Sequence, residues 1–193
     1  MELTVRDLMT VLHGMGFGAL FMLAFSGAIA VIYATAVGAP ATAQGSAPAR
    51  RPRLFHAYLV SMAGLSWLTV LSGSYLIYPW YRATPPPGVH DLSAYPQRLL
   101  LSNPMTAGWH TLGMEWKEHI AWFTPIAMTM VAYVFITYGP QLALRRGLRN
   151  AVLGFTAAAF LATAVAGLFG AFLNKEAPVR GGGVVVLYRS AGS

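Results

Sequence analysis

Four long apolar stretches dominate the hydrophobic pattern of this 193-residue chain. They cover residues 8–33, 56–77, 118–138 and 151–173, and polar, proline-rich or basic segments separate them. A transmembrane helix needs about 20 predominantly apolar residues to cross the hydrocarbon core of a bilayer. The pattern therefore predicts four membrane-spanning helices.

The connection between the second and third stretches, residues 81–117, is the longest. Three consecutive prolines, Pro85 to Pro87, forbid a regular helix there because each lacks an N–H and fixes its own backbone angle. We expect an excursion along the membrane surface with a short helix around residues 95–101. Residues 105–117 are expected to form a helical lead-in to the third stretch.

Local signals in the second half of the chain refine this picture. Pro125 lies within the third stretch and should bend that helix about one turn after His119. The fourth stretch is rich in alanine and glycine, which let helices approach closely in lipid. Residues 184–188 follow three glycines and favour a short strand or a surface loop.

The composition agrees with a chain solvated by lipid. Hydrophobic residues make up 56% and charged residues 10% of the chain, whereas soluble domains have about 25% charged residues. The absence of cysteine excludes disulfides, iron–sulfur clusters and covalently attached c-type haem. We interpret the net charge of +7 as topology signals and contacts with lipid headgroups, and we expect no nucleic-acid partner.

The distribution of charge predicts the orientation of the helices. Loops 37–55 and 140–150 contain six arginines and no acidic residue, whereas all Asp and Glu residues lie on the other side. The positive-inside rule places both loops in the cytoplasm of a prokaryotic plasma (inner) membrane. The expected fold is thus all-α: a single membrane domain (1–193), an integral membrane four-helix bundle with both termini and the long loop between helices 2 and 3 extracytoplasmic.

One segment concentrates the side chains that can carry chemistry. Residues 108–122 hold two histidines, three charged residues and three tryptophans at the start of an apolar run. His119 lies about as far along the third stretch as His13 lies along the first. Two imidazoles at equal depth on different helices are what a six-coordinate haem iron requires. We therefore predict a non-covalent haem b ligated by His13 and His119.

The surroundings of His13 suit a flat macrocycle. Gly16 and its neighbours Gly14 and Gly18 remove side chains from the helix just below His13, and Phe17 can form a wall, so Gly16 and Phe17 complete the predicted cofactor site. A second interpretation stays open, because glycines in membrane helices usually serve close packing and interfacial histidines often bond water or headgroups.

His110 is an alternative iron ligand. It lies nine residues before His119, and at 100° per residue the two face opposite sides of a continuous helix. His119 is the deeper residue, so we expect His110 to be an exposed interfacial histidine, with docking or proton handling as further roles. His56 lies at the opposite membrane face, and His90 lies in the proline-rich loop.

Two further ligands fit the same segment. Glu115 and His119 are four residues apart and share a helix face, a spacing that can hold copper or another divalent ion. The second possible ligand is a quinone. Its reduced form, a quinol, would use Glu115 or Glu118 as proton acceptor and pack on Trp109, Trp116 and Trp122.

With His13 and His119 on two of four spans, the architecture resembles the membrane-anchoring b-type cytochrome subunits of respiratory and photosynthetic complexes. The resemblance implies electron transfer between a quinone pool or partner subunit and an extracytoplasmic cytochrome or other redox protein. Many such subunits carry two haems, whereas this chain offers histidines for one. Other membrane subunits bearing further cofactors are therefore implied.

The sequence leaves two functions in competition. The first is a non-catalytic electron-transfer subunit of an oxidoreductase complex. The alternative is a cofactor-free accessory or assembly subunit of a larger membrane complex, with its small-residue helix and aromatic belts facing lipid or partners. A transporter or channel is disfavoured because no span centre holds a charged side chain.

Overall fold

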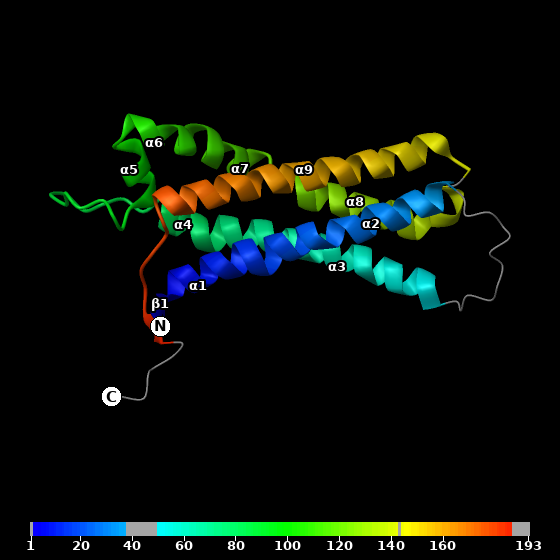
Figure 1. Ribbon diagram of the computed structural model, residues 1–193, viewed down its shortest axis with the longest axis horizontal. Helices are drawn as coiled ribbons and strands as arrows, with labels where there is room; N and C mark the ends of the chain where they lie inside the picture. The colour runs from blue at the N-terminus through cyan, green and yellow to red at the C-terminus, as the bar shows by residue number, and fades with distance from the viewer. Residues whose placement is uncertain (1, 38–49, 143, 187–193) are drawn as a thin grey trace.

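The computed structural model describes residues 2–37, 50–142 and 144–186, and these are mostly helical (Figure 1). Four helical runs are long and apolar enough to cross a membrane, which confirms the predicted helical stretches. Each run is longer than the stretch that predicted it: Val5–Tyr33, Arg53–Tyr81, Pro104–Tyr138 and Arg146–Glu176.

Three of the runs contain several helical elements. The first comprises α1 (Val5–Val11), the π-helix η1 (Leu12–Ala19) and α2 (Leu20–Val37). The second comprises α3 (Arg50–Ser72), the π-helix η3 (Gly73–Ile77) and α4 (Tyr78–Tyr81). The third comprises α6 (Pro104–Gly108), the π-helix η4 (Trp109–Met114), α7 (Glu115–His119) and α8 (Phe123–Tyr138). After a short 3-10 turn, η5 (Gly139–Gln141), the fourth run is one helix, α9 (Arg146–Glu176).

The third run has the lead-in and the bend that the sequence predicts. It is helical from Pro104 onward, and it breaks at residues 120–122 between α7 and α8. Pro125 occupies the first turn of α8, where the missing N–H needs no partner. The break therefore falls where the proline ring would clash with the preceding turn of a continuous helix.

The connection between the second and third runs is not helical around Pro85–Pro87. It contains one short helix, α5 (Pro96–Leu101), at the position expected from the sequence. Leu100 is buried in a small apolar cluster with Tyr81, Met114 and Leu173. Part of the connection therefore packs onto the end of the bundle.

A two-stranded antiparallel sheet joins the two ends of the described chain. Strand β1 (Glu2–Thr4) pairs with β2 (Val184–Val186), with Glu2 opposite Val186 and Thr4 opposite Val184. Of the two alternatives expected for residues 184–188, the strand is found over residues 184–186, and its partner is the N-terminal segment. Residues 187–188 lie outside the described residues. Thr4 also caps α1 through a reciprocal pair of hydrogen bonds with Asp7, which fixes the start of the first run.

The bundle is held by a long apolar core. α8 packs against both α3 and α9, and α2 packs against α9 and α3. Most of the largest fully buried apolar side chains of this core come from the first three runs, and Leu142 follows η5: Phe21, Ile32, Leu59, Met62, Met128, Leu142 and Val131. Small residues of α9, such as Ala159 and Ala162, are buried and let the neighbouring helices approach.

The two ends of the bundle differ in charge. All six acidic residues lie toward the end that carries the β1–β2 sheet, which we call the acidic end: Glu2, Asp7, Asp91, Glu115, Glu118 and Glu176. The opposite end, which we call the arginine end, lies where α2, α8 and the beginnings of α3 and α9 meet. Carboxylates that could exchange protons therefore lie only toward the acidic end.

Candidate functional site

Three of the four runs contain a π-helical segment in the half of the bundle near the acidic end. These segments are η1, η3 and η4. π-Helices are rare, occur mostly as single-turn bulges and are frequent at functional sites, because the wider turn displaces side chains and exposes backbone groups. Polar side chains from or beside these segments form the group that we call the polar cluster: His13, Ser72, Tyr78, Arg82, Lys117 and Glu118.

His13 of η1 faces the second helical run. Its Nδ1 lies 3.0 Å from the Ser72 hydroxyl oxygen, and that hydroxyl donates its proton to the carbonyl of Thr69 at 3.1 Å. Ser72 must therefore accept from the Nδ1–H of His13, which leaves the lone pair on Nε2. Gly73 makes room for the ring, since a Cβ there would lie 2.8 Å from Cε1 of His13.

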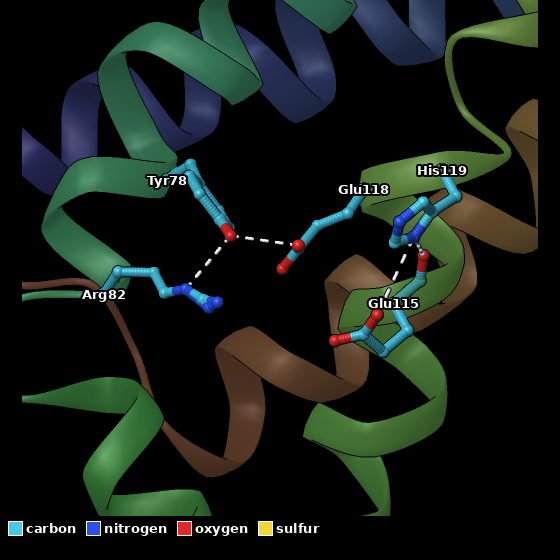
Figure 2. A network of polar contacts seen from close by, with 5 residues as sticks. All are labelled: Tyr78, Arg82, Glu115, Glu118 and His119. Atoms are coloured by element: carbon cyan, nitrogen blue, oxygen red, sulfur yellow. Dashed lines mark hydrogen bonds and ion pairs between the residues drawn. The ribbon is translucent and has the colours of Figure 1, made fainter.

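Glu118 points into the bundle and meets the end of the second run (Figure 2). The Tyr78 hydroxyl donates to Oε2 of Glu118 at 2.9 Å, and Nε of Arg82 donates to the Tyr78 oxygen at 3.0 Å. The other carboxylate oxygen, Oε1, is buried without a hydrogen-bond partner. Burying a charged oxygen without a partner is costly, and such atoms in native proteins often mark a functional requirement.

Lys117 lies beside Glu118 and reaches toward the fourth run. A Cβ on Gly170 of α9 would lie 2.7 Å from the Lys117 ammonium, so this glycine accommodates the lysine head. Lys117 is also close enough to His13 for the two basic groups to interact electrostatically. Trp116 adds an indole N–H that is buried without an acceptor. Three consecutive residues of α7, Trp116, Lys117 and Glu118, thus direct polar atoms toward neighbouring helices.

His119 has different surroundings from His13. Its side chain is 70% exposed, and its Nδ1 lies 2.9 Å from the backbone carbonyl of Glu115 on the same helix. Figure 2 shows the ring turned toward Glu115, while Glu118 turns toward Tyr78. The described contacts therefore do not bring His13 and His119 together, because one packs on Gly73 and the other lies on the surface of α7.

The prediction that His110 is exposed is wrong. His110 is 9% exposed, and its Nδ1 lies 2.8 Å from the Tyr81 hydroxyl while its Nε2 lies 3.2 Å from the Gln97 side-chain nitrogen. The ring links α4, α5 and η4. Because both nitrogens are engaged, His110 offers no free lone pair to a metal in this conformation.

The other predicted cofactor residues are placed as follows. A Cβ on Gly16 would lie 2.8 Å from Cδ1 of Leu12 on the same run, whereas a Cβ on Gly14 would meet no atom within 4 Å. Phe17 is partly buried. Gly18 is buried against Thr69 of α3, so at least one of these glycines serves close helix packing.

The tryptophans of residues 108–122 are packed within the protein. Trp109 stacks on Phe172 with 4.6 Å between ring centroids, and Trp122 meets Trp67 edge to face. Glu115 and Glu118, which lie in the same stretch of sequence, have different surroundings: Glu118 is partly buried and accepts from Tyr78, whereas the Glu115 side chain is 47% exposed. Only the inner carboxylate belongs to the polar cluster.

A haem between His13 and His119 can be tested against these positions. A six-coordinate iron needs two imidazoles on opposite faces of one porphyrin, and the described conformation does not present the two rings as such a pair. Within the described ranges, no group of three or more His, Asp or Glu side chains is placed to hold a metal ion. In the described conformation the two rings have separate partners: Ser72 and Gly73 for His13, and Glu115 for His119.

Comparisons with protein-family models, with curated proteins and with solved structures found no match for this chain. Its function must therefore be argued from the polar cluster and its place in the bundle.

Proposed function

We propose that this protein is a membrane-embedded accessory subunit of a larger complex, and that its polar cluster takes up and releases protons near the acidic end. The observation that carries the proposal is the inward-facing carboxylate of Glu118, with one oxygen bonded to Tyr78 and the other buried and unpartnered. Ionisable side chains in membrane helices that face the bundle interior commonly belong to proton pathways.

The cluster offers a hydrogen-bonded connection to the surface. Arg82 is exposed and donates to Tyr78, which in turn donates to Glu118. Arg82 keeps its own proton, so the transferred proton would come from water: the Tyr78 hydroxyl accepts it and donates its own proton to the Glu118 carboxylate. Lys117 and His13 extend the group of basic side chains farther into the bundle.

The rest of the sequence supports exchange with one face only. No Asp, Glu, Lys, Arg or His occurs in residues 14–49, 57–81, 120–144 or 150–174. The spans therefore provide no charged side chain that would carry a proton from the cluster toward the arginine end. A site open to one face suits a subunit that supplies protons to a partner's reaction better than it suits a transporter.

The direct test compares Glu118→Gln with Glu115→Gln, a matched change on the same helix at an exposed carboxylate. We expect a pH titration followed by infrared difference spectroscopy to show a buried carboxyl band that Glu118→Gln removes and Glu115→Gln retains. A band that survives in Glu118→Gln would overturn the proton-handling role.

The accessory role is tested by purification in mild detergent, where a chain that elutes without other membrane subunits contradicts it.

A haem b subunit is the second candidate, and one observation favours it. Nδ1 is engaged in both predicted ligands, by Ser72 in His13 and by the Glu115 carbonyl in His119. This outer hydrogen bond is the arrangement that orients metal-ligating histidines. A bound haem would supply one-electron transfer. The visible spectrum decides: a reduced α band lost in His13→Ala and in His119→Ala supports haem, and a colourless folded protein excludes it.

A further inference from the structure

A groove opens between α2 and α3 near the arginine end. It has a volume of about 420 Å3, and five residues line it: Gly27, Val31, Leu54, Phe55 and Tyr58. Figure 1 shows α2 and α3 diverging toward this end. The lining is almost wholly apolar, so the groove suits hydrocarbon and not water.

The groove is formed by specific contacts. Tyr58 crosses from α3 to donate its hydroxyl proton to the Ala24 carbonyl of α2. Gly27 permits this approach, since a Cβ there would lie 2.8 Å from the Tyr58 oxygen. Phe55 turns inward to meet Phe135 edge to face, with ring centroids 4.9 Å apart. The floor of the groove is therefore fixed by packing inside the bundle.

The segments at this end of the bundle are rich in arginine. Arg53 is exposed and directly precedes the lining residues Leu54 and Phe55. Five more arginines occur in the segments that border this end, and no acidic residue does: Arg50, Arg51, Arg145, Arg146 and Arg149. Basic residues beside a cleft between membrane helices attract anionic lipid headgroups.

We propose that an anionic phospholipid occupies this groove, with one acyl chain against Gly27 and Val31 and its phosphate beside Arg53. A second copy of the chain is a poorer occupant in parallel orientation, because it would bring a second set of arginines to the same end, where like charges repel. A zwitterionic lipid would fill the groove equally well but would gain less from the arginines. This site is independent of the polar cluster at the other end.

The experiment titrates the full-length protein in detergent with phosphatidylglycerol or phosphatidylcholine of identical acyl chains and counts bound lipids by native mass spectrometry. We expect one phosphatidylglycerol to bind more tightly than phosphatidylcholine. Arg53→Gln should weaken that binding about fivefold, the factor that corresponds to about 1 kcal/mol for one basic residue at the membrane surface. Val31→Trp should abolish it by filling the groove.

Leu23→Trp is the matched control, since Leu23 is exposed on α2 and does not line the groove. It should bind phosphatidylglycerol as the unchanged protein does. Equal binding of the two lipids by the unchanged protein overturns the proposal without any variant. Undiminished binding in folded Val31→Trp also overturns it, because the lipid would then contact the arginines alone.

Discussion

A single glycine determines how closely His13 approaches the second helical run. The ring lies against Gly73, and a methyl group at that position would fall 2.8 Å from Cε1. The contact atom belongs to a stiff aromatic ring that Ser72 holds in place. His13 therefore has little freedom to move away, and its position depends on the absence of a side chain at Gly73.

We expect Gly73→Ala to destabilise the bundle by about 1–3 kcal/mol through overpacking. Gly64→Ala is the control on the same run, because a Cβ there meets no atom within 4 Å, and it should be neutral or stabilising by up to about 1 kcal/mol. Unfolding in mixed micelles measures both. The double variant Gly73→Ala with His13→Ala should recover part of the loss, and no recovery would contradict the proposed contact.

Tyr78 gives the buried carboxylate its one described hydrogen bond. Tyr78→Phe should destabilise the protein by about 1–3 kcal/mol, because Glu118 would lose that bond while staying buried. Tyr75→Phe serves as the comparison, since Tyr75 is 70% exposed on the same run. If the two phenylalanine variants unfold at the same denaturant concentration, Glu118 does not depend on Tyr78.

Residue chemistry could be read from the sequence, but residue orientation could not. Glu115 and Glu118 lie three residues apart, and the sequence offers both as candidate proton acceptors. In the same way it offers both His110 and His119 as candidate ligands. Which of them turn inward depends on the helical phase, and η4 and the break before α8 both shift that phase. The expected exposure of His110 is wrong because Tyr81 of α4 and Gln97 of α5, both distant in sequence, contact its ring.

At the scale of elements, the π-helical segments explain both the polar cluster and the limits of a periodicity argument. A π turn inserts about one extra residue, so every later side chain rotates relative to a regular helix. The sequence predicts that His110 and His119 face opposite sides of a continuous helix, with His119 the deeper of the two. It assigns them the wrong way round, since His110 is buried and His119 is exposed.

His110 connects the short helix α5 to the bundle through Gln97, and to the end of α4 through Tyr81. His110→Ala should leave both partners buried without this bond, so α5 should open more readily. We expect faster amide hydrogen exchange in residues 96–101 with little change in α8. His90→Ala, at an exposed loop residue, should leave the exchange of α5 unchanged, and equal effects of both variants would count against the link.

At the scale of the whole molecule, hydropathy predicts the fold well because lipid leaves few alternatives. A chain that crosses a bilayer must satisfy its backbone hydrogen bonds within each span, and a helix of about 20 apolar residues does so. The number and order of the long helices follow directly. How they pack follows from particular contacts such as Tyr58 against Gly27, which no hydropathy profile contains.

The orientation of the bundle across the membrane is a prediction that cysteine labelling can measure directly. The chain has no cysteine, so single cysteines can be labelled without background. We expect Asp91→Cys, in the exposed connection near the acidic end, to react with a membrane-impermeant maleimide on intact cells. Gly147→Cys, exposed at the arginine end, should react only after the membrane is permeabilised. The reverse pattern would invert the orientation.

The pairing of β1 with β2 has a consequence for biosynthesis. Chains emerge from the ribosome with their N-terminal part first, so β1 is made long before its partner strand. All four long helices are therefore synthesised before the sheet can form. Closure of the acidic end is then a late step of assembly, and a chain interrupted before Val184 would insert its helices but leave the first strand unpaired.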